Sequence, residues 1–337
     1  MTGSNLKLVA KTAQVSVATA SRVLSGSDYP VSDALRARVL AVADELDYIP
    51  NAQARSLIQG NGRTIGMLVG EVGDPYFDAM INGTHRVATD EECPVTILST
   101  GRHPTHELES FRLLQSHGAA TIIVAGSGLE DADFQAALSA RIRGFRGTTV
   151  LIGRHEVDVD VDAIRVEVDN VDAGKLLGEH LRELGHQRVG VLAGRAEVTS
   201  TGDRIKGVEI GLGAAPVVLE VEPTRDGGYD GAGQLLGGHP ELTAIIGTAD
   251  QMAIGAMAWC ADHGVSVPGQ LSVAGCNDIW VGRDLTPPLT TVHMPLTEMG
   301  SAAVRLALDL DGSGRRSMSF PVEMVVRGST GPAPTTR

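Results

Sequence analysis

The sequence lacks any apolar run near the ~20 residues needed to cross a membrane, and its N-terminus has no secretory hydrophobic region. Its cysteines are only three, Cys93, Cys260 and Cys276, and they are widely spaced, without a metal-ligand pattern. These absences argue against a membrane protein, a disulfide-stapled secreted domain and a zinc site. We therefore expect a cytoplasmic protein with reduced thiols, no metal and no cofactor.

The signatures of common enzyme classes are also missing. There is no Gly-x-Ser-x-Gly elbow and no phosphate-binding Gly-x4-Gly-Lys-Ser/Thr loop. His106-Glu107 and His155-Glu156 lack the second histidine of a zinc protease, and residues 211–213 lack the third glycine of a dinucleotide fingerprint. An enzyme is one class of function to be weighed, but these motifs do not favour it.

Positive charge is scarce, which bears on any contact with nucleic acid. The 28 Lys and Arg face 41 Asp and Glu, a net charge of −13. Residues 1–63 hold seven Lys or Arg against five Asp or Glu, a net +2, which leaves −15 for the remainder. An acidic body repels phosphates, so only the N-terminal part suits DNA. The length of 337 residues predicts two or three compact units.

Two short helices are expected at the N-terminus. Asn5 caps a helix over residues 6–13, and Ser16 is a good N-cap for a second helix that starts at Val17. Helical spacing puts Ala20, Val23 and Leu24 on one face of the second helix and leaves Val17, Ala18, Ser21 and Arg22 on the other. The alternative is an ordinary helical pair in a core. An arginine among small side chains suits base edges better, which predicts a DNA-binding helix-turn-helix.

A third helix over residues 33–46, capped by Ser32, is expected to complete a DNA-binding head over residues 1–50. Pro50 is expected to end this helix, because a proline pushes the residue before it out of the helical region. Residues 51–59 are a capped stretch too short to be a stable helix alone, and 60–62 read Gly-Asn-Gly. We expect residues 51–63 to be a hinge helix and linker that folds with DNA and a partner subunit. A plain linker is the alternative.

From residue 64 the pattern alternates between strands and helices. Strands are expected over residues 64–69, 95–98, 121–125, 149–152, 188–192, 217–221, 244–247 and 271–274. Helices are expected over residues 75–89, 107–117, 172–184, 204–212, 229–236 and 251–263. Buried strands separated by helices indicate a parallel sheet, and the repeated order predicts an α/β region of two Rossmann-like subdomains over residues 64–330. Residues 331–337 are expected to be a flexible tail without a heptad pattern, so we expect no tetramer.

Several segments together resemble the lactose-repressor/galactose-repressor family of bacterial transcription regulators. They are Val9-Ala10, residues 15–26, Val31-Ser32, residues 48–51, residues 54–57 and Arg327-Gly328-Ser329-Thr330, so the resemblance covers essentially the whole chain. Gln14 stands where this family commonly has glycine, so we expect a slightly strained turn. The resemblance implies that residues 64–330 are a periplasmic-binding-protein-like sensor and that the chain is a ligand-responsive, sequence-specific repressor.

The predicted partner is double-stranded DNA with a palindromic operator, bound by a homodimer with one recognition helix in each major groove. Arg22 is the expected guanine reader because its guanidinium forms a bidentate fork. The family resemblance implies that Leu57 wedges into the minor groove at the operator centre. The predicted DNA-binding residues are Ser16, Val17, Ala18, Thr19, Ser21, Arg22, Asn51, Ala54 and Leu57.

Ligands of open parallel sheets bind beyond the carboxyl ends of the strands, so the effector site is expected in the loops that follow them. The predicted effector-binding residues are Tyr76, Phe77, Arg154, Asp169, Arg204, Asp250, Asn277 and Trp280. The resemblance implies an effector contact at Tyr76 and Phe77, which could equally be core aromatics. Asp250 could instead cap the following helix.

The expected effector is a small molecule, with a sugar favoured over a purine. Val198 stands where a purine-binding member of the family has an arginine. Pro223 stands where that member and the lactose repressor have an aromatic residue. Asn277 replaces a frequent aspartate and Ala249 a frequent asparagine. These departures argue against a purine, although Trp280 could supply a stacking face. A transport binding protein is the third class of function, and the helix-turn-helix counts against it.

Overall fold

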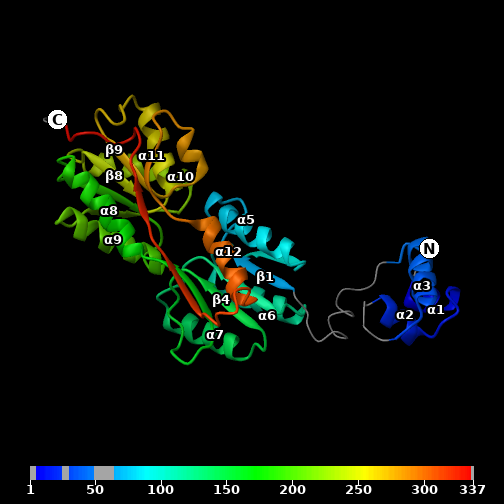
Figure 1. Ribbon diagram of the computed structural model, residues 1–337. Helices are drawn as coiled ribbons and strands as arrows, with labels where there is room; N and C mark the ends of the chain where they lie inside the picture. Colours follow the sequence, from blue (N-terminus) through cyan, green and yellow to red (C-terminus); the bar gives the residue numbers. More distant parts are fainter. Residues whose placement is uncertain (1–4, 25–29, 49–63, 335–337) are drawn as a thin grey trace.

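The computed structural model describes residues 5–24, 30–48 and 64–334. Its first part is a head of three helices, α1 (Leu6–Thr12), α2 (Val17–Leu24) and α3 (Asp33–Glu45) (Figure 1). The three predicted N-caps are present, because the side chains of Asn5, Ser16 and Ser32 accept hydrogen bonds from backbone amides three residues later. Small apolar side chains from all three helices form the core of the head: Val9, Ala10, Ala13, Ala20, Val23, Val39 and Ala43.

The turn between α1 and α2 adopts the strained conformation expected from the sequence. Gln14 has a φ of 51°, in the left-handed region where side chains are disfavoured. The turn is closed by a hydrogen bond of 2.9 Å from the Val15 amide to the Ala10 carbonyl oxygen. The predicted hinge and linker, residues 51–63 with Asn51, Ala54 and Leu57, lie outside the described residues.

The first α/β unit, here called the N-lobe, has a wholly parallel six-stranded sheet in the order β11-β5-β4-β3-β1-β2. Its strands are β1 (Ile65–Val69), β2 (Val95–Ser99), β3 (Thr121–Ala125), β4 (Thr148–Ile152), β5 (Ile164–Val168) and β11 (Ser317–Phe320). Its helices are α5 (Pro75–Asp90), α6 (Pro104–Ser116), α7 (Ala132–Arg143) and α12 (Leu296–Ala307). Every residue of β1 and β3 is buried, as expected for strands covered on both faces.

The second unit, the C-lobe, has the order β12-β10-β9-β8-β6-β7, in which only the edge strand β12 runs antiparallel to its neighbour. Its strands are β6 (Val189–Ala193), β7 (Val217–Glu220), β8 (Ala244–Gly247), β9 (Ser272–Asn277), β10 (Thr290–His293) and β12 (Glu323–Val325). Its helices are α8 (Asn170–Glu183), α9 (Thr199–Leu212), α10 (Arg225–Gly238), α11 (Asp250–Asp262) and the short 3-10 helix η1 (Trp280–Arg283). The two parallel-sheet subdomains are therefore as predicted.

Three chain segments connect the lobes (Figure 1). They are residues 168–170 between β5 and α8, 293–296 between β10 and α12, and 320–323 between β11 and β12. The prediction from sequence placed no element after residue 274 and omitted α7. It therefore missed that the chain returns to the N-lobe through α12, which packs against α5, and β11, and then ends in the C-lobe.

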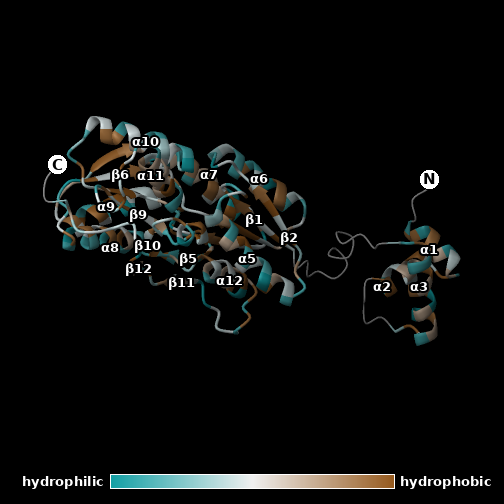
Figure 2. Ribbon diagram, turned by 90° about the horizontal axis from the view of Figure 1, so that it is seen from above, coloured by the Kyte–Doolittle hydropathy of each residue, from teal (hydrophilic) through white to brown (hydrophobic). Residues whose placement is uncertain are grey.

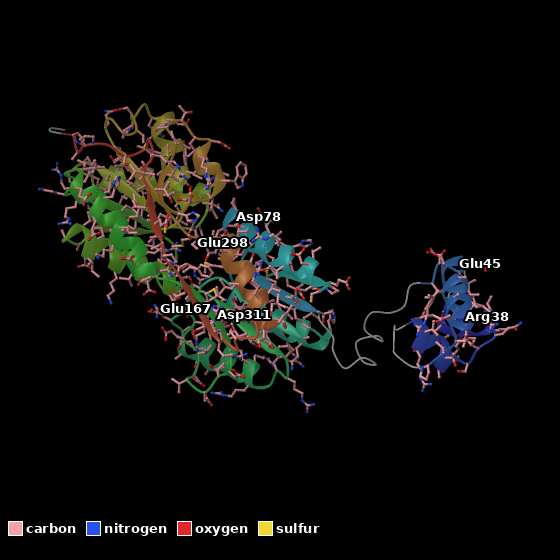
Figure 3. All side chains as sticks on the ribbon, in the orientation of Figure 1. Arg38, Glu45, Asp78, Glu167, Glu298 and Asp311 are labelled. Atoms are coloured by element: carbon pink, nitrogen blue, oxygen red, sulfur yellow. The ribbon has the colours of Figure 1, made fainter. Side chains whose placement is uncertain are left out.

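Hydropathy follows this arrangement. The strands are the most apolar parts of both lobes in Figure 2, whereas charged side chains such as Asp78 on α5 and Glu298 on α12 are exposed (Figure 3). None of the helices among the described residues is long and apolar enough to cross a membrane. Residues 331–334, predicted as part of a flexible tail, contact the C-lobe, where the Ala333 amide donates a 2.8 Å hydrogen bond to the Leu184 carbonyl oxygen.

Candidate functional site

The head exposes one face of α2. Val17, at 43% exposure, is accessible together with Ala18 and Arg22, whereas Ala20 and Val23 on the opposite face are buried. The sequence prediction of the two faces is therefore confirmed at these five positions, whereas Ser21 and Leu24 are both half-buried. The Ser16 hydroxyl is engaged at the helix start, 3.0 Å from the Thr19 amide and 2.8 Å from the Thr19 hydroxyl. The exposed face thus offers a guanidinium fork and small apolar groups.

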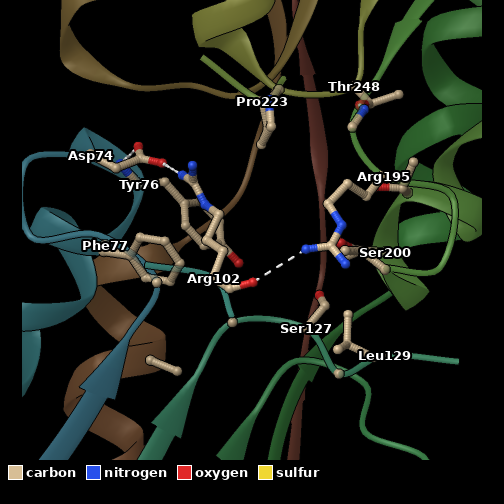
Figure 4. Close-up of a pocket in the computed structure, with 18 of the residues that line it drawn as sticks. Asp74, Tyr76, Phe77, Arg102, Ser127, Leu129, Arg195, Ser200, Pro223 and Thr248 are labelled. Atoms are coloured by element: carbon tan, nitrogen blue, oxygen red, sulfur yellow. Dashed lines mark hydrogen bonds and ion pairs between the residues drawn. The ribbon is translucent and has the colours of Figure 1, made fainter. Parts of the chain in front are cut away.

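A cleft lies between the two lobes, at the carboxyl ends of their strands (Figure 4). The N-lobe contributes the segments after β1, β2 and β3, and the C-lobe contributes those after β6, β7, β8 and β9. This is the edge where parallel sheets bind ligands. Four of the predicted effector residues line the cleft: Tyr76, Phe77, Arg204 and Asn277.

Two aromatic side chains form part of the N-lobe wall. The rings of Tyr76 and Phe77 meet edge to face at a centroid distance of 5.0 Å, and Phe77 is 6% exposed. Both also pack against the core of the lobe, so the two alternatives considered for them, ligand contact and core packing, are compatible. Burial raises the pKa of the Tyr76 phenol, and the nearby Arg204 opposes this effect.

Arg204 lies in the C-lobe, on α9, and its guanidinium is buried among the connecting segments. It donates hydrogen bonds to Asn170 Oδ1 at 2.9 Å, to the Thr248 carbonyl oxygen at 2.5 Å and to the sulfur of Met294 at 3.3 Å. The backbone of α9 lies very close to α8 here, because a Cβ on Gly174 would come within 2.0 Å of the Arg204 carbonyl oxygen. Helix packing therefore positions this arginine at the cleft.

Asn277, at the end of β9, combines backbone strain with an unsatisfied acceptor. Its φ is 123°, outside the range that side chains prefer. Its Oδ1 is buried and accepts no hydrogen bond from the described residues. The next residue, Asp278, is fixed by Arg327 at 2.5 Å and Arg283 at 3.1 Å. Burial acts to raise the pKa of Asp278, but these guanidinium groups hold it below its usual value.

Two cleft arginines were not in the predicted set. Arg102, after β2, pairs with Asp74 and lies 3.4 Å from Glu71, and Arg195, after β6, pairs with Glu197 at 2.6 Å. Arg195 Nη1 also reaches the Arg102 carbonyl oxygen across the cleft at 3.4 Å (Figure 4). Both arginines follow predicted strands, so their position in the sequence was the signal that could have found them.

The other four predicted effector residues do not line the cleft. Arg154 is engaged with carboxylates, including Asp203 of the C-lobe, and Asp169 caps α8 by accepting a hydrogen bond from the Asp172 amide. Trp280 is 62% exposed on η1. A position after a strand predicts the correct edge of the sheet, but not the direction of the side chain.

Asp250 lies behind the cleft wall, at the start of α11. It accepts hydrogen bonds from the Thr291 hydroxyl at 2.6 Å and the Ile279 amide at 2.8 Å. Burial raises its pKa to about 6, against the effect of these donors. Its bond to the Ile279 amide fixes the loop that directly follows Asn277, the last residue of β9. Across the residues that the structure describes, no group of three or more His, Cys, Asp or Glu could hold a metal ion.

Comparison with known proteins gives two family matches. Residues 5–51 match the model of bacterial regulatory proteins of the lacI family, and residues 179–330 match that of a periplasmic binding protein-like domain. The HTH-type transcriptional regulator GalR of Escherichia coli (strain K12) is 34% identical over 313 residues, which cover 91% of this chain and 89% of GalR. The HTH-type transcriptional repressor CytR of the same strain is 30% identical and covers 98% of this chain and 97% of its own length.

Solved structures share the fold. The lac repressor dimer bound to operator and the anti-inducer ONPF has a TM-score of 0.80 at 24% identity, covering 97% of this chain and 99% of its own. A LacI family regulator from Enterococcus faecium with bound ribose has a TM-score of 0.70 at 22% identity and covers 80% of this chain and all of its own.

Proposed function

Because the chain belongs to the lacI family of bacterial regulatory proteins, it is a DNA-binding transcriptional regulator, and we propose that a carbohydrate bound between its lobes controls its binding to operator DNA. The observation that carries this proposal is the cleft, which is lined from both lobes and belongs to the same chain as an exposed helix-turn-helix face. Binding to chromosomal operators would place this activity in the cytoplasm.

The DNA-reading part of the proposal rests on α2. Arg22 would donate a bidentate pair to a guanine, and Val17 and Ala18 would contact thymine methyl groups. Ser16, Thr19 and Ser21 would hold phosphates or base edges, and the family resemblance adds Asn51, Ala54 and Leu57 in the hinge. One short head per chain supports a homodimer on a palindromic site, as in the lac repressor dimer bound to its operator.

The effector part rests on the polar groups that line the cleft. Arg204 would donate to a ring or hydroxyl oxygen, Asn277 would accept from a hydroxyl, and Tyr76 and Phe77 would cover an apolar face of the ring. Alternating donors and acceptors with one aromatic wall suit a sugar. A solved fold relative holds ribose, and the ribose operon repressor of Haemophilus influenzae is 28% identical over 312 residues.

The test of DNA reading is binding-site selection with the full chain, followed by titration of the selected duplex over a range of salt concentrations. We expect a palindromic site and a loss of affinity as salt rises. Arg22→Ala should cost about 1–3 kcal/mol on the selected site and relax the base preference at one position per half-site. Arg38→Ala, an exposed arginine on α3 (Figure 3), is the control and should leave the preferred sequence unchanged. An asymmetric or sequence-independent site contradicts the proposal.

The effector is tested by adding carbohydrates to the protein–DNA complex and to the protein alone. A carbohydrate that binds should raise the melting temperature by mass action and change operator affinity. Tyr76→Ala should abolish both effects while DNA binding without a ligand persists. A purine that acts where no sugar does contradicts the choice of carbohydrate but leaves the regulator intact.

A further inference from the structure

Glu107 is a cleft residue with a buried carboxyl oxygen that no group among the described residues satisfies. It lies in the first turns of α6, which begins at Pro104, and it lines the cleft on the N-lobe side. Its Oε1 is buried and accepts no hydrogen bond from any described residue. Burial raises the pKa of Glu107 to about 7.

The cations of the cleft are engaged elsewhere. Arg102 pairs with Asp74 and Glu71, and Arg195 pairs with Glu197. The buried guanidinium of Arg204 donates hydrogen bonds to an amide oxygen, a carbonyl oxygen and a sulfur, so these groups orient it although none of them neutralises its charge. A buried carboxylate without a cation is costly, and sites that keep one are often sites where a ligand supplies the partner.

A second unsatisfied acceptor faces the same cleft from the other lobe. Asn277 Oδ1 is buried without a donor, and Asn277 and Glu107 both line the cleft. A ligand that satisfies both must therefore present O–H or N–H donors toward opposite lobes. Above its pKa of about 7, the Glu107 carboxylate would repel a negatively charged ligand. Of the arginines that line the cleft, Arg102 and Arg195 are already paired with carboxylates, which leaves Arg204 to bind the oxygens of a neutral ligand.

We propose that Glu107 selects the effector by charge, so that the cleft takes a neutral or amino-substituted carbohydrate and rejects sugar phosphates and uronic acids. This inference rests on the proposed function, because it assumes that the cleft holds a carbohydrate. Glu107 would accept a hydrogen bond from a hydroxyl or a protonated amine of the ligand. Asn277 would accept a second one from the C-lobe side of the cleft.

The first experiment needs no variant. The melting temperature of the full chain is measured with four matched pools: pentoses and hexoses, the corresponding amino sugars, the uronic acids and the sugar phosphates. We expect stabilisation by members of the neutral or amino pools only. A uronic acid or phosphate that binds more tightly than its neutral counterpart overturns the inference and leaves the carbohydrate effector standing.

The second experiment compares Glu107→Gln with Glu109→Gln, which removes the same charge from an exposed position on the same helix. We expect Glu107→Gln to weaken binding of the best amino sugar at least tenfold, or of the best neutral sugar at least threefold, and to improve binding of its uronic acid. Glu109→Gln should change each affinity less than twofold. Equal affinities in the two variants overturn the role of Glu107. If no pool stabilises a protein that still binds its operator, the carbohydrate class itself fails, and this inference fails with it.

Discussion

Arg154 and Asp203 join the two lobes, with Arg154 Nε 2.8 Å from Asp203 Oδ2. The first residue follows β4 in the N-lobe, and the second lies on α9 in the C-lobe. Beside them, the Thr199 hydroxyl donates to the Arg154 carbonyl oxygen at 2.8 Å, and the Thr199 amide donates to the Gly128 carbonyl oxygen at 3.0 Å. This group of contacts ties together one flank of the cleft, and of its four residues Gly128 also lines the cleft.

Asp203→Asn tests this tie between the lobes. The variant keeps the shape of the side chain but loses its charge. Because the Arg154–Asp203 pair is partly buried, we expect the contact between the lobes to lose about 1 kcal/mol of stability. Hydrogen exchange at the Thr199 and Glu130 amides, which bridge the lobes, should speed up about fivefold. Asp230→Asn, an exposed change on the C-lobe, is the control. Unchanged exchange in Asp203→Asn would show that the backbone contacts suffice.

Gln14→Gly should stabilise the turn between α1 and α2. Gln14 has a φ of 51°, which glycine adopts without steric cost, and we expect a gain of about 0.5–1 kcal/mol. The Val15 amide, hydrogen-bonded to the Ala10 carbonyl oxygen, should exchange more slowly in the full chain. Gln14→Ala gains no such freedom and serves as the control. Faster exchange in the glycine variant would mean that the Gln14 side chain stabilises the turn.

The stability of the free protein should depend on pH through Glu107. Its pKa in the folded state is raised to about 7 from an ordinary value of 4.5, so the folded state binds more protons than the unfolded chain between these values. This proton uptake therefore contributes to the free energy of unfolding. The contribution is fully present below pH 4.5 and is lost as the pH rises through 7. The melting temperature of Glu107→Gln relative to the parent should therefore rise between pH 5 and pH 8, by an amount corresponding to at most about 3 kcal/mol. A difference that does not vary with pH would contradict the raised pKa.

Leu57→Ala tests the hinge, whose residues lie outside the described part of the chain. A leucine between the head and a Gly-Asn-Gly linker has little core of its own to join, so the minor groove at the dimer axis is its expected partner. We expect weaker operator binding and a smaller DNA bend, centred on a flexible pyrimidine–purine step, with effector affinity nearly unchanged. Gel-shift and bending assays measure both quantities. A full bend angle together with full affinity would reduce residues 51–59 to a tether.

The sequence was most informative where a local rule determines the structure. Asn5, Ser16 and Ser32 marked helix starts because their side chains cap the amides three residues on, and the strand at residues 64–69 was evident from its near-continuous apolar character. Local rules do not predict which strands pair when they are far apart in the sequence. β11 lies beside β5, about 150 residues earlier, and no local pattern in residues 317–320 indicates that partner.

The predicted effector-binding residues also show what a local sequence pattern cannot predict. Tyr76, Phe77, Arg204 and Asn277 were placed at the cleft because they follow strands, but so were Arg154 and Trp280, whose side chains point elsewhere. Glu107 was passed over as part of a failed zinc-protease motif. What distinguishes it is a buried oxygen without a hydrogen-bond partner among the described residues, and its burial depends on parts of the chain that are distant in sequence.

The return of the chain through α12, β11 and β12 has a consequence for biosynthesis. A nascent polypeptide emerging from the ribosome reaches the edge strand of its N-lobe sheet only with residues 317–320, after most of the C-lobe has been made. Neither lobe can complete its sheet as an autonomous unit during translation, in contrast to domains that fold one after another from the N-terminus. A chain truncated before residue 317 would lack both β11 and β12, so β5 and β10 would become exposed edge strands. We expect such a fragment to be bound by chaperones and degraded by proteases, and not to act as a sensor.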